Sequence, residues 1–392
     1  NGIRGQEFNS LEIKLTERFS EVKNTEVSLS PSEELLKALF VLLNEDKTHE
    51  CLALVNQYLK EFPNAIDLHN ISGLALTKIK DFPAAIESFR RAISIAPDLA
   101  PLFFNLGNAY NQFNKTNQAI SQYKRAIELN PKYAEAYYNL AGVQKRFANK
   151  IAAMDSYNLA IKANPNYAEA YNNLGVILQK LSQHRLAASY LQKAVVLQPR
   201  NASAFFNYAN SLRELEESDK ALENYDYAIK INPSFSIAFN NRGSLLEGIN
   251  NYEGAWRSYT KAIELNPSYV AAYINRAGIG QKLGNYVQAE LDLIKAIDLD
   301  PWKQTDPSEA SNFKFRLYIS LGDTQMYLGQ YKKALASYDS AIAIEPENKD
   351  VLAFKGNALA SLGKLSQGLR LRQKSFGFIC FDVLKGVSIV RG

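Results

Sequence analysis

The chain contains little of several residue types that mark particular classes of protein. Its 392 residues include two cysteines, two methionines, two tryptophans and three histidines. Cys51 and Cys380 stand far apart, so no disulfide framework can form, and we expect a reducing, cytoplasmic location. His49 and Cys51 are neighbours, but two such residues alone do not make a metal site. The sequence therefore predicts no metal and no other cofactor.

Long apolar runs and an excess of one charge are also missing. No apolar stretch reaches the roughly 18 residues that a membrane-spanning helix needs, and Asn1 to Glu7 show no signal-peptide pattern. Lys and Arg, at 45, nearly balance Asp and Glu, at 40, and they are spread along the chain. A nucleic-acid-binding protein usually concentrates its basic residues on one face. We therefore expect neither nucleic acid nor membrane among the partners.

The sequence also lacks the motifs of the common enzyme classes. It has no Gly-rich phosphate-binding loop, no nucleophile elbow and no kinase signature. We therefore predict that this chain is not an enzyme.

Proline recurs at a fixed interval. Each proline of the main series follows an apolar helical run and a polar or turn-forming residue, as in Asn130-Pro131. Because proline cannot continue a helix, a helix ends at every such point, and we expect the preceding Asn to adopt a left-handed cap conformation. Eight prolines, each 34 residues from the next, form the series: Pro63, Pro97, Pro131, Pro165, Pro199, Pro233, Pro267 and Pro301.

Small and aromatic residues recur with the same period. If proline is position 32 of a repeat, positions 20 and 27 are alanine, position 24 is mostly aromatic, and position 8 is Gly or Ala. Gly107, Ala119, Tyr123 and Ala126 are one such set. Positions 20, 24 and 27 share one face of a helix. Small residues let two helices approach closely while the rings fill the space beside them, so the pattern predicts two packed helices per repeat.

This pattern resembles the tetratricopeptide repeat family, and Asn105-Leu106-Gly107, Asn139-Leu140-Ala141 and Asn173-Leu174-Gly175 carry it closely. The resemblance implies an all-α fold, a right-handed superhelical solenoid of helix-turn-helix repeats. The repeat units are most similar to those in the repeat arm of O-GlcNAc transferase-type proteins. The RNA-reading pentatricopeptide family lacks the alternation of small and aromatic residues and is disfavoured.

The repeats also set the expected domain boundaries. Residues 1–30 are a poorly defined N-terminal segment, and residues 31–375 form a solenoid of about nine repeats plus a degenerate tenth. An insert occupies residues 302–312, where the interval between prolines is longer. The apolar tail, residues 376–392, contains strand-like sequence from Phe376 to Phe381. This tail either folds over the last helix or begins a truncated further domain.

One polar series is left over once the packing positions are assigned. Position 6 of the first helix is Asn in six successive repeats, and position 9 adds two more. In the tetratricopeptide repeat family the first helix lines the concave surface, so the resemblance implies a ladder of Asn inside the groove. A side-chain amide offers donors and an acceptor together, which matches a peptide bond. The predicted peptide-binding residues are Asn105, Asn108, Asn139, Asn173, Asn207, Asn210, Asn241 and Asn275.

These features favour a protein-interaction scaffold that binds other proteins or peptides in an extended conformation. Adjacent helices lie about 8–10 Å apart and an extended peptide rises about 3.3 Å per residue, so one Asn could contact about every third residue. The alternative is a substrate-recruiting arm of a larger, glycosyltransferase-like enzyme whose catalytic domain is absent from this chain. We do not expect the carboxylate clamp of chaperone-tail binders, because position 6 is Asn and position 2 carries residues such as Glu135 and Glu169.

Overall fold

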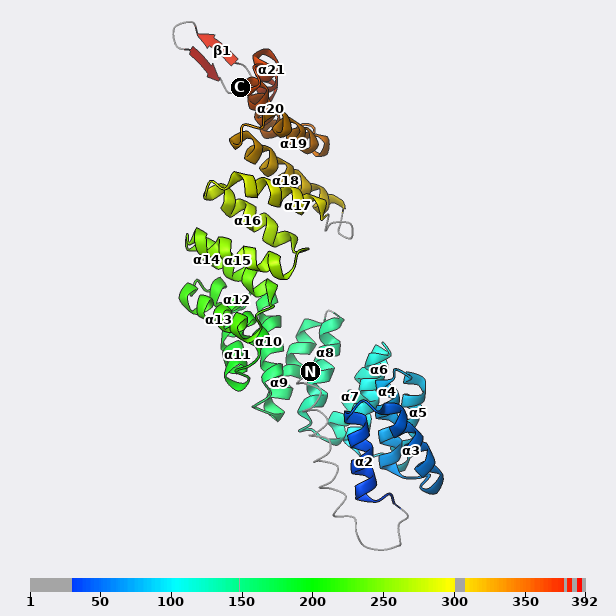
Figure 1. Ribbon diagram of the computed structural model, residues 1–392. Helices are drawn as coiled ribbons and strands as arrows, with labels where there is room; N and C mark the ends of the chain where they lie inside the picture. The colour runs from blue at the N-terminus through cyan, green and yellow to red at the C-terminus, as the bar shows by residue number, and fades with distance from the viewer. Residues whose placement is uncertain (1–29, 148, 300–306, 377–378, 383–385, 390–392) are drawn as a thin grey trace. The chain divides into compact units, whose positions relative to one another are not determined.

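The chain folds into helices that follow one another in pairs (Figure 1). In the described part there are twenty helices, α2 to α21, and one short antiparallel pair of strands, which confirms the helical repeat fold. The helices divide into two compact units, residues 1–197 and residues 198–392. The computed structural model describes residues 30–147, 149–299, 307–376, 379–382 and 386–389.

The first unit contains five helix pairs joined by short turns. Within each pair the two helices pack together, and the second helix also contacts the first helix of the next pair. Each helix is therefore held by its neighbours in sequence, as in a solenoid. The helices are α2 (Glu33–Asn44), α3 (Thr48–Glu61), α4 (Ile66–Lys78), α5 (Phe82–Ile95), α6 (Ala100–Gln112), α7 (Thr116–Leu129), α8 (Ala134–Arg146), α9 (Lys150–Ala163), α10 (Ala168–Lys180) and α11 (His184–Leu197).

The second unit repeats this arrangement with five further pairs and ends in the strands. Neighbouring helices contact one another in the same order as in the first unit. The elements are α12 (Ala202–Glu214), α13 (Ser218–Ile231), α14 (Ser236–Gly248), α15 (Tyr252–Leu265), α16 (Val270–Lys282), α17 (Tyr286–Asp298), α18 (Pro307–Tyr327), α19 (Tyr331–Ile344), α20 (Lys349–Ser361), α21 (Leu365–Phe376), β1 (Ile379–Asp382) and β2 (Gly386–Ile389).

The alternation of small and aromatic residues closes each helix pair. A methyl group added at Gly107 would lie 2.7 Å from Cε1 of Tyr123, so the ring of position 24 packs directly on the bare backbone of position 8. Gly243 faces Tyr259 in the same way, at 2.6 Å. The small residue at position 8 is therefore required by the approach of a ring from the partner helix, as the sequence pattern predicts.

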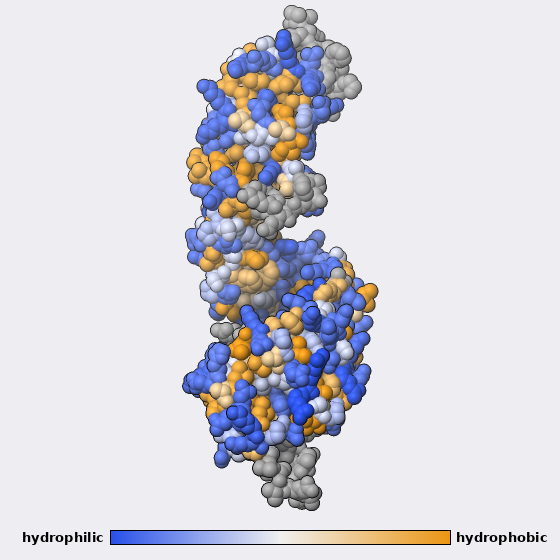
Figure 2. All heavy atoms as spheres, turned by 90° about the vertical axis from the view of Figure 1, so that its right-hand side faces the viewer, coloured by the Kyte–Doolittle hydropathy of each residue, from blue (hydrophilic) through white to orange (hydrophobic). Residues whose placement is uncertain are grey.

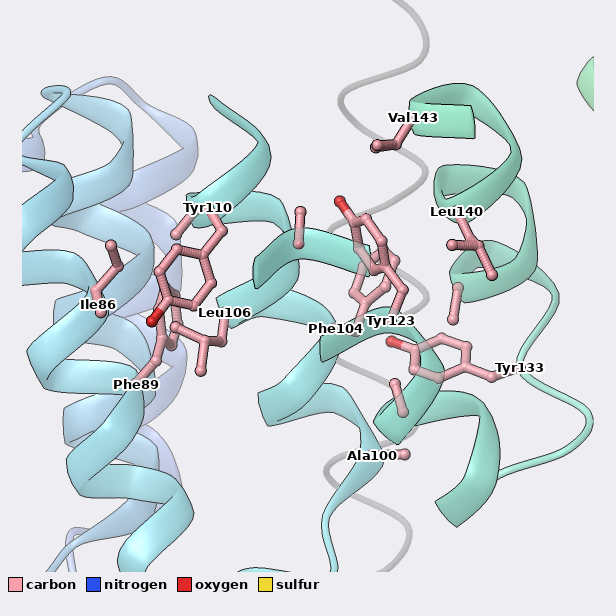
Figure 3. Packing of buried hydrophobic residues seen from close by; sticks show 14 of the residues in the cluster. Ile86, Phe89, Ala100, Phe104, Leu106, Tyr110, Tyr123, Tyr133, Leu140 and Val143 are labelled. Carbon is pink, nitrogen blue, oxygen red and sulfur yellow. The ribbon is translucent and has the colours of Figure 1, made fainter. Parts of the chain in front are cut away.

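Aromatic rings also join one pair to the next. The centroid of the Phe104 ring lies 6.0 Å from that of Tyr123 and 5.0 Å from that of Tyr133. Figure 3 shows these rings between the helices, with Leu140 and Val143 approaching from α8. All five side chains are buried. One cluster of buried side chains thus extends from Ala85 in α5 to Val143 in α8, across three successive helix pairs.

The turns differ from the expectation in one respect. Asn130, which precedes a proline, has φ −137° and ψ 91°, so the predicted left-handed conformation is wrong at this residue. The proline ring disfavours helical backbone in the residue before it, and Oδ1 of Asn130 instead accepts a hydrogen bond from the N–H of Lys132 at 3.1 Å. Left-handed backbone occurs instead in turns between the two helices of a pair, at Lys80, Asn114 and Gly284 among others.

Three of the predicted segments can be compared with the structure: the N-terminal segment, the insert and the tail. The N-terminal segment 1–30 lies outside the described residues except for Ser30, and residues 302–306 of the insert lie outside them too. Residues 307–312 of the insert form the start of α18, a helix of 21 residues. In the tail, β1 and β2 pair antiparallel with Ile379 opposite Ile389, which confirms strands in this segment. The other boundaries stay predictions.

Figure 2 shows hydrophilic and hydrophobic residues mixed over the face that it presents. Exposed apolar side chains such as Ile151 and Val196 belong to different helices. Apolar side chains scattered in this way are normal on a protein surface, whereas the first helices carry the predicted asparagines.

Candidate peptide-binding surface

The eight predicted asparagines lie on the first helices of six successive pairs, α6 to α16 (Figure 1). Asn105 is buried, with 3% of its surface exposed, and the other seven are partly buried. Because the chain divides into two compact units, the predicted series of asparagines consists of two sets, one in each unit. Asn105, Asn108, Asn139 and Asn173 belong to the first unit, and Asn207, Asn210, Asn241 and Asn275 belong to the second.

Several of these amides bridge adjacent repeats. In one pattern, Nδ2 of a position-6 Asn donates to the side chain at position 5 of the preceding repeat. Asn105 donates to Oδ1 of Asn70 at 2.9 Å, and Asn275 donates to Oδ1 of Asn240 at 3.0 Å. Asn173 likewise donates to the hydroxyl of Tyr138, at 2.8 Å. The amide series thus connects neighbouring first helices.

In a second pattern the acceptor is position 9 of the preceding repeat. Asn139 donates to Oδ1 of Asn108 at 2.8 Å, and Asn241 donates to Oδ1 of Asn210 at 3.1 Å. The same Oδ1 of Asn108 also accepts the hydroxyl of Tyr123 at 2.8 Å, which ties the bridge to the aromatic core. A side-chain amide has two N–H donors, and each of these bonds uses one of them.

Four of the predicted residues line one cavity in the first unit. Asn105, Asn108, Asn139 and Asn173 contribute to a cavity of about 1170 Å³, together with residues of α4, α6, α8 and α10. The repeat period places these side chains on successive first helices, which is why residues far apart in sequence share one wall. A cavity of this size, lined on one side by amides, has room for a stretch of polypeptide backbone.

Basic side chains stand in the same lining. Lys78 and Lys80 lie at the end of α4 and in the turn after it, and Lys145 and Arg146 end α8. Desolvation lowers the pKa of Lys145, and the nearby charge of Lys180 lowers it further. Its ammonium group donates to Oδ1 of Asn173 at 3.3 Å, a neutral acceptor. The cavity thus combines amides with cationic groups.

Sequence reasoning missed part of this surface. The partners Asn70 and Tyr138 occupy position 5 and were not predicted, although a polar residue at that position is visible in the sequence. Lys145 and Arg146 were not predicted either. Their signal was the recurrence of basic residues at the end of first helices, which becomes meaningful only when the repeats are stacked.

A cluster of metal ligands and a membrane-spanning helix are two further features that the described residues could form. Among them, no group of three or more His, Cys, Asp or Glu side chains is placed to hold a metal ion. No helix in this part of the chain is both long enough and apolar enough to cross a membrane.

Family models match most of the helical region. Models described as TPR repeat or tetratricopeptide repeat together span more than half of the chain. No curated protein matches it. The TPR repeat model matches residues 73–114 and 107–146, and the tetratricopeptide repeat models match residues 134–167, 156–187, 172–234, 240–302 and 315–348.

Similar solved structures are also known. YrrB, described as a TPR protein with an unusual peptide-binding site, is 29% identical over 48% of this chain and 96% of its own, with a TM-score of 0.44. MamA from Desulfovibrio magneticus is 20% identical over 43% of this chain and 96% of its own, with a TM-score of 0.41. A tetratricopeptide repeat protein from Parabacteroides merdae is 19% identical over 66% and 98%, with a TM-score of 0.47.

Proposed function

Because the chain belongs to the tetratricopeptide repeat family, we propose that it is a protein-interaction scaffold that holds an extended polypeptide in the Asn-lined cavity of its first unit. Proteins of this family generally mediate protein–protein interactions. The partner would lie across the first helices, with its backbone amides facing the partly exposed side chains of Asn108, Asn139 and Asn173, while the buried Asn105 holds α6 against α4. The asparagines of the second unit form a separate set that does not line this cavity.

The observation that carries this proposal is the meeting of four amides from three successive first helices in one cavity. The bonds between repeats hold Asn139 and Asn173 in fixed orientations, at 2.8 Å from their acceptors. A preoriented amide loses less freedom when it binds a ligand than a mobile one. Each bridge uses one N–H of Asn139 or Asn173 and leaves the second N–H of that amide for a ligand.

The energetics favour weak binding that tolerates many sequences. Each hydrogen bond to a peptide nets about 0.5–1.5 kcal/mol, so the three partly exposed asparagines contribute roughly 1.5–4.5 kcal/mol before the peptide is ordered. Backbone contacts of this kind do not read side chains. A partner that binds usefully needs additional contacts to other residues of the cavity.

The test blocks the cavity without disturbing the amides. Gly142 lies in the cavity lining, and a Cβ added there meets no atom within 4 Å. Gly142→Trp should therefore fill the cavity while α8 keeps its fold. Gly278 occupies the same repeat position in α16 of the second unit and is equally open, so Gly278→Trp is the matched control.

The measurement is the set of proteins captured from an extract of the source cell by each variant, with thermal unfolding recorded in parallel. We expect Gly142→Trp to lose partners that the wild type and Gly278→Trp retain, with melting temperatures unchanged or slightly raised, because Trp forms helix better than Gly. Retention of every partner by a folded Gly142→Trp variant would refute binding in this cavity.

The alternative, a substrate-recruiting arm of a larger transferase, stays a prediction, and so do the cytoplasmic location and the absence of enzymatic activity. The observation that favours the transferase arm is the pair of strands β1 and β2 after the last helix, because two strands alone are marginally stable. The full-length gene sequence tests it: a glycosyltransferase domain encoded in the same reading frame would favour the arm.

A further inference from the structure

Basic residues gather at one edge of the cavity in the first unit. Lys145 and Arg146 end α8, Lys78 ends α4, and Lys80 lies in the turn that follows α4. Lys78 and Arg146 occupy the same position, 13, in their repeats. Asp46 is the one carboxylate among the described lining residues, and it pairs with Lys78 at 2.5 Å. The edge therefore carries more positive than negative charge.

The remaining cations of this edge face neutral groups. Arg146 donates to Oδ1 of Asn111 at 2.6 Å, and Lys145 donates to Oδ1 of Asn173 at 3.3 Å. Within the ranges that the structure describes, no carboxylate pairs with Lys80, Lys145 or Arg146. Each of these three side chains thus has capacity for an anionic acceptor.

At the corresponding helix ends of the second unit, basic side chains pair with carboxylates of the same unit. Arg213 at the end of α12 pairs with Glu214 at 2.7 Å. Lys282 at the end of α16 pairs with Glu247 of α14 at 2.8 Å. Positions 12 and 13 therefore carry charges paired with carboxylates at Arg213 and Lys282, whereas Lys145 and Arg146 at the same positions of α8 pair with no described carboxylate. This contrast indicates that the charge in the first unit serves an external partner.

We infer that the polypeptide held in the first unit is an acidic segment whose Asp or Glu side chains pair with Lys145 and Arg146 while the asparagines hold its backbone. This inference rests on the proposed function and names the class of its ligand. These ion pairs would supply contacts in addition to the hydrogen bonds to the peptide backbone. An extended segment of about 12 residues spans roughly 40 Å, enough to reach several first helices.

The surroundings of Lys145 support this pairing. Desolvation and the nearby charge of Lys180 lower its pKa, so the charged form is less favourable there than in water. A carboxylate brought next to the ammonium group would oppose this lowering of the pKa, because an opposite charge favours the charged form. Pairs of this kind at a partly exposed site weaken as salt rises.

The experiment uses the full chain and two fluorescein-labelled peptides of twelve residues, alternating Ser-Glu and alternating Ser-Gln, with binding followed by fluorescence anisotropy. The test variant is Lys145→Gln/Arg146→Gln. The control is Arg185→Gln/Lys193→Gln, which removes the same charge from exposed residues of α11 that do not line the cavity. A single-stranded DNA of twelve nucleotides serves as a second anionic probe.

We expect the Ser-Glu peptide to bind the wild type and the control variant about tenfold more tightly than the Ser-Gln peptide, a preference of the size expected for two partly screened ion pairs. The test variant should lose most of this preference, and so should the wild type at high salt.

Three outcomes overturn the inference. If both peptides bind equally and the test variant binds like the wild type, charge plays no part, and the proposed peptide-binding function stands. If the DNA binds as tightly as the Ser-Glu peptide and depends on the same two residues, the site takes anions in general. If neither peptide binds, the acidic segment is not the ligand, and the capture experiment with Gly142→Trp judges the proposed function separately.

Discussion

The side-chain amide of Asn105 donates a hydrogen bond of 2.9 Å to Oδ1 of Asn70 in the preceding repeat. Both side chains are buried, with 3% and 2% of their surfaces exposed. Water therefore cannot replace either partner easily, and the bond joins α4 to α6. Because this bond is buried, a substitution of Asn105 should change the stability of the stacked repeats measurably.

Asn105→Ala should lower the free energy of unfolding by about 1–3 kcal/mol, because it leaves a buried acceptor on Asn70 without its donor. Urea unfolding followed by circular dichroism checks the value. The double variant Asn70→Ala/Asn105→Ala should lose less than the sum of the two single variants, since neither partner is then left unsatisfied. Strict additivity would show that the bond contributes little to stacking.

The fold could be predicted from the sequence because its determinants are local and periodic. The interval between prolines indicates where helices end. The small residues that face rings, such as Gly107 opposite Tyr123, indicate where the two helices of a pair are in contact. The partners of the asparagines could not be predicted. Position 6 reaches position 5 of the preceding repeat at Asn173 but position 9 at Asn139, and that choice depends on how the side chains of two stacked helices interlock.

The cavity was hidden from the sequence for a related reason. Lys78 and Arg146 are separated by two full repeats, so they share an edge only because the first helices stack. The even spread of charge along the chain, which argues against a nucleic-acid-binding face, conceals this local excess. Net charge is a property of composition, whereas the charge of a cavity depends on which residues the fold brings together.

Gly107 and Gly142 lie in adjacent first helices, α6 and α8, and should respond in opposite ways to the same change. Gly107→Val should destabilise the chain by about 1–3 kcal/mol, since its side chain would overlap the Tyr123 ring, 2.7 Å from the added Cβ. Gly142→Val should be neutral or stabilising by up to about 1 kcal/mol, because the position is open and Gly is a poor helix former. Thermal or urea unfolding of both variants measures the contrast. Equal losses at the two positions would contradict the packing of rings on position 8.

Arg276 and Asp292 form a bidentate ion pair inside the second unit, with distances of 2.8 Å and 2.7 Å. The side chains are 11% and 2% exposed. Arg276→Leu should cost about 3–5 kcal/mol, because it leaves the Asp292 carboxylate buried and unpaired. The loss is read from urea unfolding.

A second variant separates this effect from a simple loss of packing. Leu140 and Ser156 occupy in α8 and α9 the positions that Arg276 and Asp292 occupy in α16 and α17. Arg276→Leu/Asp292→Ser therefore introduces a pair that this chain already uses, and most of the stability should return. If the double variant is as unstable as the single one, the ion pair contributes more than the mutual neutralisation of two charges.

Asp323 of α18 accepts a hydrogen bond of 2.7 Å from the hydroxyl of the buried Tyr338. Desolvation raises the pKa of this carboxyl, and the bond from Tyr338 offsets only part of the rise. The folded chain therefore holds the proton more strongly than the unfolded chain does. By linkage, the contribution of Asp323 to stability is greatest below the pKa of the unfolded carboxyl and falls as pH rises through the pKa of the folded one.

Asp323→Asn removes this dependence and keeps an Oδ1 acceptor for Tyr338. The resulting pair already occurs in the chain, where Asn108 accepts the hydroxyl of Tyr123 at 2.8 Å. We expect Asp323→Asn to be more stable than the wild type at pH 7, and the difference to shrink at acidic pH, where the carboxyl is protonated. Urea unfolding at pH 4, 5, 6 and 7 gives both values. A variant that is less stable at pH 7 would mean that the charged carboxylate is the better acceptor for the buried hydroxyl, so that this bond outweighs the desolvation of the charge.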